Sequence, residues 1–413
     1  MKIAFYDTIK INTTYSFELL KHIAKYYKHE IVEPINCDVL CVSLTSHYEI
    51  DKLKKARKEY KDKIIIVGGH VSNAPACLLT YADYVNLGQG FEFFRDAKKI
   101  SDIENLPYIV SKNKREGTYS HFIDWDILPI VKISKYSYSY LESVGCKNKC
   151  KFCLTSWLNK YQVNPKQKTI SMLVERYRKM QYNQFYLIGN NYEGESCNLN
   201  VSDVTLKGYI KNPGKYKKTK LIRVGIESPD EKTRFFLGKK ITDDEVKEFF
   251  KITKHLKKRV NIFLMAGFDT QEVWESFKDI LGQDFNTTPK INFIVNYFDP
   301  SLGTPLYNFD LTGLIPINIM KIKRLWKIYN GRTIIFRDNS ISWKNNVIDS
   351  LLQRCDETKT ELILRLQKNN YKSYKEMLDI FMMQGLEKEI KGVKEYSINL
   401  KNWHGKSFYN VGK

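Results

Sequence analysis

The sequence predicts an α/β protein that begins with a doubly wound parallel sheet, continues with a second α/β unit and ends in helices. Short apolar segments alternate with amphipathic ones over residues 1–125, the pattern of a parallel sheet covered by helices on both faces. A second series of apolar segments follows in residues 126–310, and residues 311–413 carry the apolar period of amphipathic helices. These three observations divide the chain into three parts.

Length and composition fit a globular protein. The chain has 413 residues, 43% of them hydrophobic, which is enough to bury the cores of two or three domains. No apolar run approaches the roughly 20 residues that cross a bilayer, so we expect no membrane span. The first residues do not resemble a signal peptide, so we expect a cytoplasmic protein whose cysteines are reduced.

The net charge of +21 is concentrated in the later part of the chain. Residues 1–100 hold 15 Lys/Arg and 12 Asp/Glu, a balance of +3, which leaves +18 for residues 101–413. An acidic partner such as nucleic acid or another polyanion would therefore meet that later part. A lysine-rich face that is merely solvated is the alternative.

Residues 1–125 contain the alternating elements of the first sheet. Strands are predicted at Met1–Tyr6, Glu30–Ile35, Cys37–Leu44, Lys63–Gly68 and Tyr84–Leu87. Helices are predicted between them, at Tyr15–Tyr27 and Ile50–Tyr60. The segment His121–Pro129, whose proline and acidic residues suit a turn, is the expected linker to the second unit.

Small and polar residues gather where these strands end, at the edge where parallel sheets bind ligands. They are Ser43, Thr45, Gly68, Gly69 and Gly88. Glycine at such a position permits a positive φ and lets a bulky ligand approach the backbone. Ordinary strand-to-helix turns are the alternative interpretation of each position taken singly.

Three cysteines, Cys146, Cys150 and Cys153, lie close together in the segment Gly145–Cys153. Three thiolates on a [4Fe–4S] cube leave one iron without a protein ligand, and a substrate or cofactor can bind there. A structural zinc site usually has four ligands in two pairs, and no second pair follows at a suitable spacing. A disulfide does not suit a reduced compartment. The spacing therefore predicts a catalytic iron–sulfur cluster.

The C-x3-C-x2-C spacing, with the aromatic Phe152 ahead of the third cysteine, resembles the signature of radical S-adenosylmethionine (SAM) enzymes. The resemblance implies a [4Fe–4S] cluster on these cysteines, whose free iron binds SAM. One-electron reduction then cleaves SAM to a 5′-deoxyadenosyl radical. It also implies a partial (β/α)6 radical SAM barrel over residues 126–310 and a reductant such as flavodoxin or ferredoxin.

The resemblance gives the second unit an order of strands. The first strand should be Lys132–Val144, with the cysteines at its carboxyl end, where the sites of α/β barrels lie. Later strands are expected at Gln184–Ile188, Leu221–Glu227, Arg259–Gly267 and Ile291–Tyr297, and a helix at Thr169–Gln181. The interval between residues 190 and 226 is short for the family, so a strand and its helix are either missing or reorganised there.

Six residues match positions that surround SAM in that family. They are Phe152, Asn190, Glu227, Ser228, Met265 and Gly267. Asn190 replaces the acidic residue that holds the SAM amino group, which weakens that contact. Glu227 ends an apolar strand in a Gly-Ile-Glu-Ser segment and would accept the ribose hydroxyls, while Lys239 or Lys240 would balance the SAM carboxylate. Packing is the alternative role of Phe152 and Met265.

The residues at the edge of the first sheet resemble the cobalamin-binding domain that precedes the barrel in one large subgroup. Ser43 and Thr45, together with the Gly68-Gly69 pair, would line the nucleotide tail of the vitamin. The family's Asp-x-His-x-x-Gly loop for the lower cobalt ligand is replaced here by the segment Asp7–Asn12. His70, in an adjacent loop, is either a cobalt ligand or an ordinary loop residue.

With cobalamin as a third cofactor, the resemblance implies methylation of an unactivated carbon. A cobalamin-free radical SAM enzyme that catalyses rearrangement, epimerisation or modification of a nucleic acid or peptide is one alternative. A basic nucleic-acid-binding protein with a structural metal loop is another. For the latter, seven basic residues between Asp203 and Glu227 are interleaved with Tyr209 and Tyr216, as in sites that bind phosphates and stacked bases. A solvated lysine loop competes with that interpretation.

The last part of the chain is expected to form a helical extension. Helices are predicted at Ile317–Tyr329, Val347–Leu366 and Tyr374–Gln384. We expect them to cover the mouth of the barrel and to shape the substrate pocket. Trp343, Trp403 and His404 are interpreted as packing residues.

Overall fold

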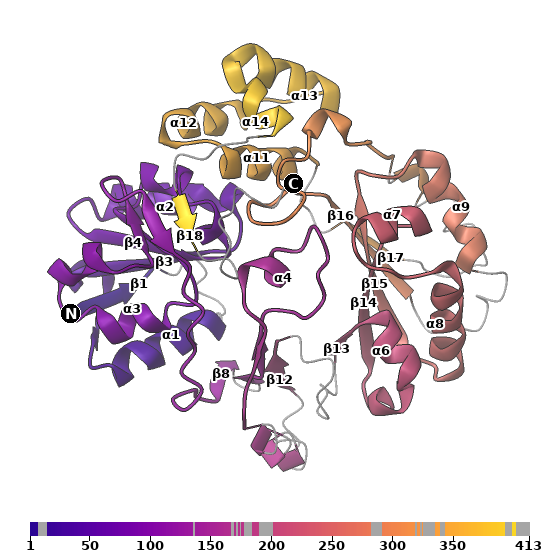
Figure 1. Cartoon of the computed structure of the whole chain (residues 1–413), viewed down its shortest axis with the longest axis horizontal. Helices are drawn as coiled ribbons and strands as arrows, with labels where there is room; N and C mark the ends of the chain where they lie inside the picture. The colour runs from indigo at the N-terminus through magenta and orange to yellow at the C-terminus, as the bar shows by residue number, and fades with distance from the viewer. Residues whose placement is uncertain are drawn as a thin grey trace.

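A computed structural model gives the structure of the chain. It describes residues 1–6, 15–134, 137–166, 169–170, 172–173, 175–176, 184–189, 201–281, 291–318, 320–322, 324, 335–338, 343–392 and 399–401. Figure 1 shows two α/β units side by side, a loop with a short helix between them, and helices across the top. The described part of the chain contains no helix of the length and apolarity that crossing a bilayer requires.

The first unit is the predicted doubly wound sheet. Its six strands have the order β2-β1-β3-β4-β5-β6, in which all neighbours are parallel except the last pair. They are β1 (Lys2–Phe5), β2 (Glu30–Ile31), β3 (Val39–Leu44), β4 (Ile64–Gly69), β5 (Tyr84–Asn86) and β6 (Ile109–Ser111). The predicted strand Glu30–Ile35 ends early because Pro34 opens a 3-10 turn, which lasts to Asn36.

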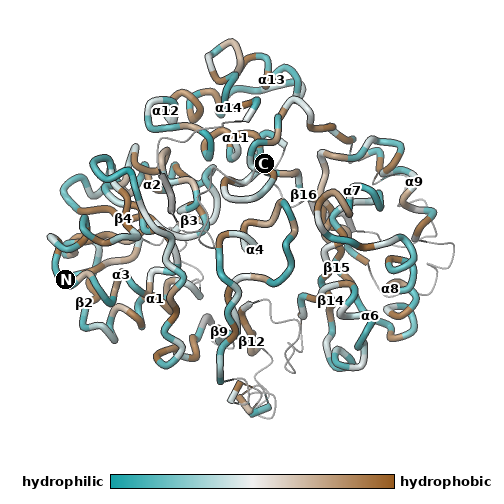
Figure 2. The backbone as a smooth tube through the Cα atoms, viewed as in Figure 1, coloured by the Kyte–Doolittle hydropathy of each residue, from teal (hydrophilic) through white to brown (hydrophobic). Residues whose placement is uncertain are grey.

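Helices cover both faces of this sheet, as the apolar strands require. They are α1 (Tyr15–Tyr26), α2 (Ile50–Glu59) and α3 (Phe91–Asp96). The strand order reverses between β1 and β3, and ligands of such sheets bind outside the carboxyl ends at this reversal. Figure 2 shows hydrophobic residues along the strands and hydrophilic ones along the loops and outer helical faces.

The second unit contains two separate groups of strands. The larger group, in the order β13-β14-β15-β16-β17, is parallel throughout. Its members are β13 (Val201–Val204), β14 (Leu221–Glu227), β15 (Arg259–Ala266), β16 (Ile291–Tyr297) and β17 (Ile335–Asp338). Helices α8 (Asp243–His255) and α9 (Gln271–Leu281) pack together on its outer face (Figure 1).

The smaller group has the order β12-β9-β8, with β12 (Gln184–Ile188) parallel to β9 (Ser137–Leu141). The predicted strand Lys132–Val144 is divided into three. β8 (Val131–Ser134) pairs antiparallel with β9, whereas β10 (Ser143–Val144) pairs with β11 (Gln162–Val163). The described residues of the predicted helix Thr169–Gln181 are helical.

The short interval between residues 190 and 226 has not lost its strand and helix. β13 is the expected third strand, and α6 (Leu206–Lys211) follows it directly. Thr205 caps this helix by accepting a hydrogen bond from the Gly208 amide, at 3.1 Å. The alternative that these elements are missing is therefore wrong, because six residues are enough for a helix that packs closely against α8.

The helical extension packs mainly on the first unit. It comprises α11 (Trp343–Arg354), α12 (Glu357–Leu366), α13 (Tyr374–Phe381) and α14 (Glu387–Lys391). Asp356 starts α12 by accepting a hydrogen bond from the Thr358 amide, so the predicted helix Val347–Leu366 is two helices. The described residues of the predicted helix Ile317–Tyr329, namely 317–318, 320–322 and 324, include a helical segment from 320.

Apolar residues of these four helices belong to the same hydrophobic core as the first sheet. Helix α11 packs against the turn His47–Glu49, and α12 packs against the turn Cys77–Thr80. The extension also borders the expected barrel mouth, because Asn346 of α11 donates to the carbonyl of Tyr297 at the end of β16, and Trp343 and Val347 lie beside Gly267 at the end of β15. Trp343 packs against Tyr374, as expected of a packing residue, and Trp403 and His404 lie outside the described residues.

Candidate functional site

The cysteine loop lies between the two α/β units. Both of its flanks are anchored in the core of the first unit, through Leu141 before the loop and Leu158 after it. Gly145 has a φ of 75°, and a Cβ there would lie 2.8 Å from the Asn159 carbonyl oxygen. A larger residue would separate the loop from the segment that follows it, so the sequence begins this loop with glycine.

Hydrogen bonds hold the interior of the loop. The indole Nε1 of Trp157 donates to the Cys150 carbonyl at 2.8 Å, and Lys149 Nζ donates to the Ser156 carbonyl at 2.9 Å. Trp157 and Ser156 belong to α4 (Leu154–Leu158), the helix that follows the third cysteine. On the opposite side, the Lys151 amide donates to the Leu237 carbonyl of the second unit, at 2.9 Å. The loop is thus fixed from both units.

The three cysteines are shielded from solvent to different degrees. Cys146 and Cys150 are 7% and 6% exposed, and Cys153 is partly exposed. Burial raises the pKa of the Cys150 thiol to about 11, with Lys239 opposing the shift and Cys153 adding to it. A bound cation would supply the positive charge that stabilises thiolates here. The residues therefore suit a metal centre.

Within the described ranges, no three His, Cys, Asp or Glu side chains are placed to hold a metal ion. A four-iron cube takes each thiolate on a different iron, so its ligands lie further apart than those of one ion. Cys146 and Cys153 both raise the pKa of Cys150, as thiols of the same short loop do.

Glu227 ends β14 in an unusual backbone conformation. Its φ is 74°, in the left-handed region, and the register between β14 and β15 shifts between Gly225 and Glu227. Its Oε1 forms an ion pair with Lys239 Nζ at 2.9 Å, and the two side chains are only 13% and 21% exposed. Burial opposes the charge of Lys239, but Glu227 outweighs it and raises the lysine pKa above its usual value.

Gly225 makes room for this ion pair. A Cβ at Gly225 would overlap Oε1 of Glu227 and would lie 2.9 Å from Lys239 Nζ. Strained non-glycine residues of this kind concentrate at functional sites, because the surrounding structure must hold them. The ion pair holds the Glu227 carboxylate at the turn that packs against the cysteine loop, since a Cβ at Gly238, next to Lys239, would lie 3.5 Å from the Cys150 Cα.

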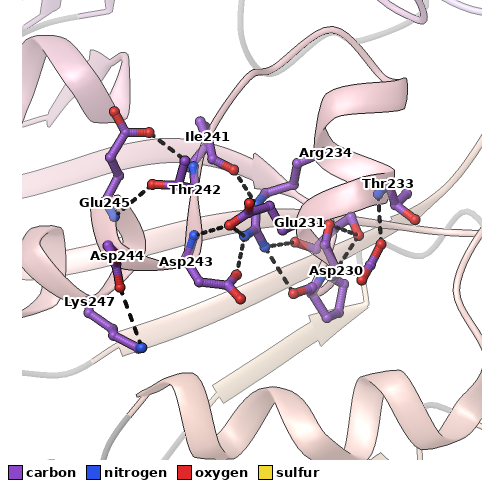
Figure 3. A network of polar contacts seen from close by, with 12 residues as sticks. Asp230, Glu231, Thr233, Arg234, Ile241, Thr242, Asp243, Asp244, Glu245 and Lys247 are labelled. Atoms are coloured by element: carbon purple, nitrogen blue, oxygen red, sulfur yellow. Dashed lines mark hydrogen bonds and ion pairs between the residues drawn. The ribbon is translucent and has the colours of Figure 1, made fainter.

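A buried arginine fixes the turn that carries Lys239. Arg234 lies in α7 (Glu231–Phe236) and is fully buried. Its guanidinium donates to the carbonyls of Ile241, Ser228 and Pro229 at 2.9–3.0 Å, and also to the Asp243 carboxylate (Figure 3). Five donors in one rigid plane therefore hold both ends of the turn.

The remaining residues predicted to surround SAM are placed as follows. Phe152 packs against the apolar cluster formed by Leu237, Met265 and Phe298, so the structure brings Phe152 and Met265 together. Gly267 directly follows β15 and has a φ of 128°. It packs against the same cluster, since a Cβ there would lie 3.4 Å from the Cβ of Phe298.

Ser228 is fully buried, and its hydroxyl donates to Asp269 at 2.7 Å. It helps to build the turn after β14 instead of facing an open pocket. Asn190 lies outside the described residues.

A cavity of about 370 Å³ lies between the carboxyl edge of the first sheet and the cysteine loop. All five positions predicted from the sheet edge line it: Ser43, Thr45, Gly68, Gly69 and Gly88. From the second unit, the lining includes Ser143, Gly145, Leu158 and Gly189. The cavity is thus shared by both units, which the sequence did not indicate.

The wall of this cavity fits an organic ligand with polar groups. Gly69 and Gly88 have φ values of 98° and 117°, so both occupy backbone conformations that favour glycine. The buried Asn86 Oδ1 and Ser143 Oγ, in two residues of the lining, have no hydrogen-bond partner. Buried polar atoms are normally paired, so these two are consistent with a binding site.

His70 lines the same cavity with an exposed side chain, and desolvation by the cavity wall around it lowers the pKa of its imidazole. The ring is therefore neutral at pH 7, the form that binds metals or accepts a hydrogen bond. The segment Asp7–Asn12, which replaces the family's cobalt-ligand loop, lies outside the described residues.

Two aromatic residues of the basic segment are not available for stacking with bases. Tyr209 and Tyr216 are 0% and 4% exposed, and their ring centroids lie 5.5 Å apart in the core of the second unit. Lys207 pairs with Glu245 at 3.1 Å on the surface. The expected stacking of bases on these tyrosines is wrong, because they alternate with the lysines along the sequence but point inward, while a polyanion partner for the lysines stays a prediction.

The sequence did not identify Trp157, Gln89 or Asn159, although each has a role at the site. Gln89 Nε2 donates to Asn159 Oδ1 at 2.5 Å and links the sheet edge to the residue after α4. The Gly-Gln-Gly segment after β5 indicates a turn that requires glycine. Trp157, four residues after the third cysteine, is close enough in sequence to hydrogen-bond the cysteine loop.

No family model and no curated protein sequence matches the chain. Solved structures do match its fold. The radical S-adenosylmethionine methyltransferase TsrM from Kitasatospora setae, with tryptophan substrate and a SAM analog bound, has a TM-score of 0.53 at 10% identity. The alignment covers 71% of this chain and 72% of that one.

A second match is the cobalamin-dependent S-adenosylmethionine radical enzyme OxsB with aqua-cobalamin and S-adenosylmethionine bound. Its TM-score is 0.52 at 13% identity, over 94% of this chain and 71% of that one. A structure of TsrM with cobalamin and a [4Fe–4S] cluster gives 0.52 at 11% identity. The fold of this chain is therefore the fold of cobalamin-dependent radical SAM enzymes.

Proposed function

We propose that the chain is a radical SAM enzyme that binds cobalamin and methylates an unactivated carbon or modifies it in a related way. In this proposal Cys146, Cys150 and Cys153 hold a [4Fe–4S] cluster. When bound, the cluster and SAM supply one-electron cleavage and hydrogen abstraction, and cobalamin supplies the methyl group. A reductant such as flavodoxin or ferredoxin delivers the electron.

One observation carries the proposal. The buried Cys150 lies against the turn that holds Lys239, since a Cβ added at Gly238 would lie 3.5 Å from the Cys150 Cα. Glu227, at the carboxyl end of β14, forms an ion pair with that lysine. Thiols, a strained carboxylate and an ammonium thus meet at one strand end, which is where α/β sheets place their chemistry.

The residues of the chain have distinct roles in this proposal. Glu227 accepts hydrogen bonds from the ribose hydroxyls. Lys239, expected from the sequence to balance the SAM carboxylate, is paired with the Glu227 carboxylate, which leaves the SAM carboxylate to Lys240 in this proposal. Phe152 and Met265 form an apolar wall that excludes water from the adenine side. Water exclusion matters because it strengthens each electrostatic contact and protects reactive species.

The cavity beside the loop is the proposed site for the nucleotide tail of cobalamin. Its five sheet-edge residues and the neutral His70 suit an organic ligand of this kind. The cavity also reaches Gly145 and Ser143, next to the first cysteine. A corrinoid with its tail here would lie beside the cluster, as methyl transfer requires.

The decisive test is anaerobic reconstitution with iron and sulfide, followed by SAM and dithionite. We expect about four irons per chain and formation of 5′-deoxyadenosine. Cys150→Ala should lose both the iron and the product, whereas Cys355→Ala, in a buried thiol of the helical extension, should keep both. An iron-replete wild-type sample that forms no 5′-deoxyadenosine would overturn the proposal.

A further inference from the structure

Helix α4 lies between the cavity and the cysteine loop. Thr155 and Leu158 line the cavity. Trp157, between them in sequence, donates from its indole Nε1 to the Cys150 carbonyl at 2.8 Å. One short helix therefore contacts both of the proposed cofactor sites.

The helix is anchored in the core of the first unit. Leu158 is 2% exposed and belongs to the core of the first sheet, and Leu154 and Trp157 pack against that core. The position of the third cysteine, which immediately precedes α4, is thus set by the first unit. Any ligand that orders the cavity wall acts on the same helix.

Gln89 joins the end of this helix to the edge of the first sheet. It stands between Gly88 and Gly90, whose φ values of 117° and 80° shape the turn after β5. Its Nε2 donates to Oδ1 of Asn159 at 2.5 Å, and Asn159 is only 8% exposed. Both side chains line the cavity, so a ligand there would contact the hydrogen bond itself.

We propose that Gln89 is a positioning residue that couples the two sites through α4, so that a corrinoid and the iron–sulfur cluster stabilise each other's binding. This inference rests on the proposed function. A ligand that fills the cavity restrains Gln89, Asn159 and Leu158. The loop then loses less conformational entropy when the cluster binds, so the cluster binds more tightly. Thermodynamic linkage requires that the effect be reciprocal.

The coupling is measured with hydroxocobalamin as the probe. Equilibrium dialysis gives its dissociation constant for iron-free protein and for protein reconstituted with iron and sulfide. We expect binding to be about tenfold tighter in the reconstituted protein, within the usual range of coupling between sites. In the reverse direction, hydroxocobalamin should raise the fraction of iron that the protein retains at equilibrium with a fixed concentration of chelator.

Variants of Gln89 separate positioning from general folding. Gln89→Ala should bring the ratio of the two dissociation constants close to one while iron content stays unchanged. Gln89→Glu should keep most of the ratio, because the Asn159 amide can turn its NH2 group toward the carboxylate. Gln271→Ala, at a hydrogen-bonded glutamine on the outer helix α9, is the matched control and should keep the full ratio.

Three results would overturn the coupling: equal dissociation constants in the wild type, an unchanged ratio in Gln89→Ala, or a ratio that Gln271→Ala lowers equally. Protein that takes up iron and cleaves SAM but does not bind hydroxocobalamin would overturn the coupling and leave radical SAM chemistry standing. Protein that takes up no iron would overturn the proposed function together with the coupling.

Discussion

Glu227 combines a strained backbone with a paired carboxylate. A left-handed conformation costs a non-glycine residue about 1–2 kcal/mol, so another interaction must compensate for it. The ion pair with Lys239 at 2.9 Å offsets part of this strain in a shielded position. The carboxylate is therefore held in one place before any ligand arrives, which is the property that a cofactor contact needs.

Replacing Glu227 with Ala should weaken SAM binding without loss of iron. Hydrogen bonds to a charged group contribute about 1.5–3 kcal/mol, so we expect affinity to fall about 10- to 100-fold. Isothermal titration of SAM into the reconstituted protein measures the change. Glu248→Ala, in an exposed pair on α8, is the control. Unchanged SAM affinity in Glu227→Ala would mean that the carboxylate does not contact the cofactor.

Gly225→Ala tests the same site without removing a functional group. The new Cβ would displace the Glu227 carboxylate, so SAM affinity should fall as in Glu227→Ala. Because the φ of Gly225 is not positive, alanine adds no backbone strain of its own, and we expect the melting temperature to fall no further than in Glu227→Ala, which loses the same ion pair. Gly214→Ala is a matched control, since its nearest neighbour would lie at an ordinary 3.7 Å. Equal SAM affinities in both glycine variants would contradict the proposed geometry.

At the scale of elements, the turn between β14 and α8 depends on Arg234. The guanidinium is fully buried and satisfies three carbonyls and one carboxylate. Removing such a group leaves buried acceptors without donors, which is far less favourable than losing a surface ion pair. The turn is thus a rigid support for Lys239 and Gly238.

Arg234→Met should lower the free energy of unfolding of the second unit by about 3–5 kcal/mol. Urea unfolding followed by tryptophan fluorescence and circular dichroism reports the loss. Arg365→Met, at an exposed arginine of α12, should change it by less than about 0.5 kcal/mol. If both variants unfold at the same urea concentration, the hydrogen-bond network of Figure 3 is not a structural support.

At the scale of the whole molecule, the three parts of the chain meet at a buried pair of acids. Gln353 Nε2 in α11 donates to Asp349 at 2.8 Å and to Asp299, at the end of the second unit, at 3.1 Å. Asp349 also accepts hydrogen bonds from Ser46 and from the Tyr48 amide of the first unit. This polar junction joins the first unit, the second unit and the extension.

Burial works against ionisation of both acids, but their pKa values shift in opposite directions. Burial and the neighbouring Asp349 raise the pKa of Asp299 well above its usual value. For Asp349, burial works against ionisation, but His47 and the donated hydrogen bonds outweigh it and lower the pKa. Ser350 donates to Asp299 at 2.7 Å. This hydrogen bond and the charge of Arg354, on the same helix, lower the pKa of Asp299 but do not outweigh burial and Asp349. The negative charge is therefore favoured on Asp349 over Asp299.

Asp299→Asn should flatten the dependence of stability on pH. Because the folded pKa of Asp299 is raised, its protonated form stabilises the fold at low pH. That contribution is lost as the pH rises from the unfolded value of about 4 through the folded pKa. Asparagine keeps a neutral side chain that can donate, so its melting temperature should fall less between pH 5 and pH 8 than that of the wild type.

Asp349→Asn should have the contrasting effect. Its depressed pKa means that the ionised form stabilises the fold at pH 7 and is lost only as the pH falls through the folded pKa. The substitution should therefore lower the melting temperature at pH 7, where Asp299→Asn should not. Thermal scans of both variants at pH 5, 6, 7 and 8 make the comparison, and identical pH profiles would contradict the placement of the negative charge on Asp349.

The amino-acid sequence was enough to predict features that depend on short-range patterns. The strands of the first sheet follow from the alternation of apolar and amphipathic segments, and the three neighbouring cysteines follow from their spacing. The five sheet-edge residues were predicted to share a site because carboxyl ends of parallel strands meet at one edge, and all of them line the cavity.

Tertiary structure decided the features that depend on residues far apart in the chain. It buried Tyr209 and Tyr216, paired Glu227 with Lys239, placed the C-terminal helices on the first sheet and joined Gln89 to Asn159. The pattern of apolar residues in the sequence determines which face of a helix or strand is apolar, but not which other element packs on that face. Only the folded chain brings those partners together, and the proposed site is built from such pairs.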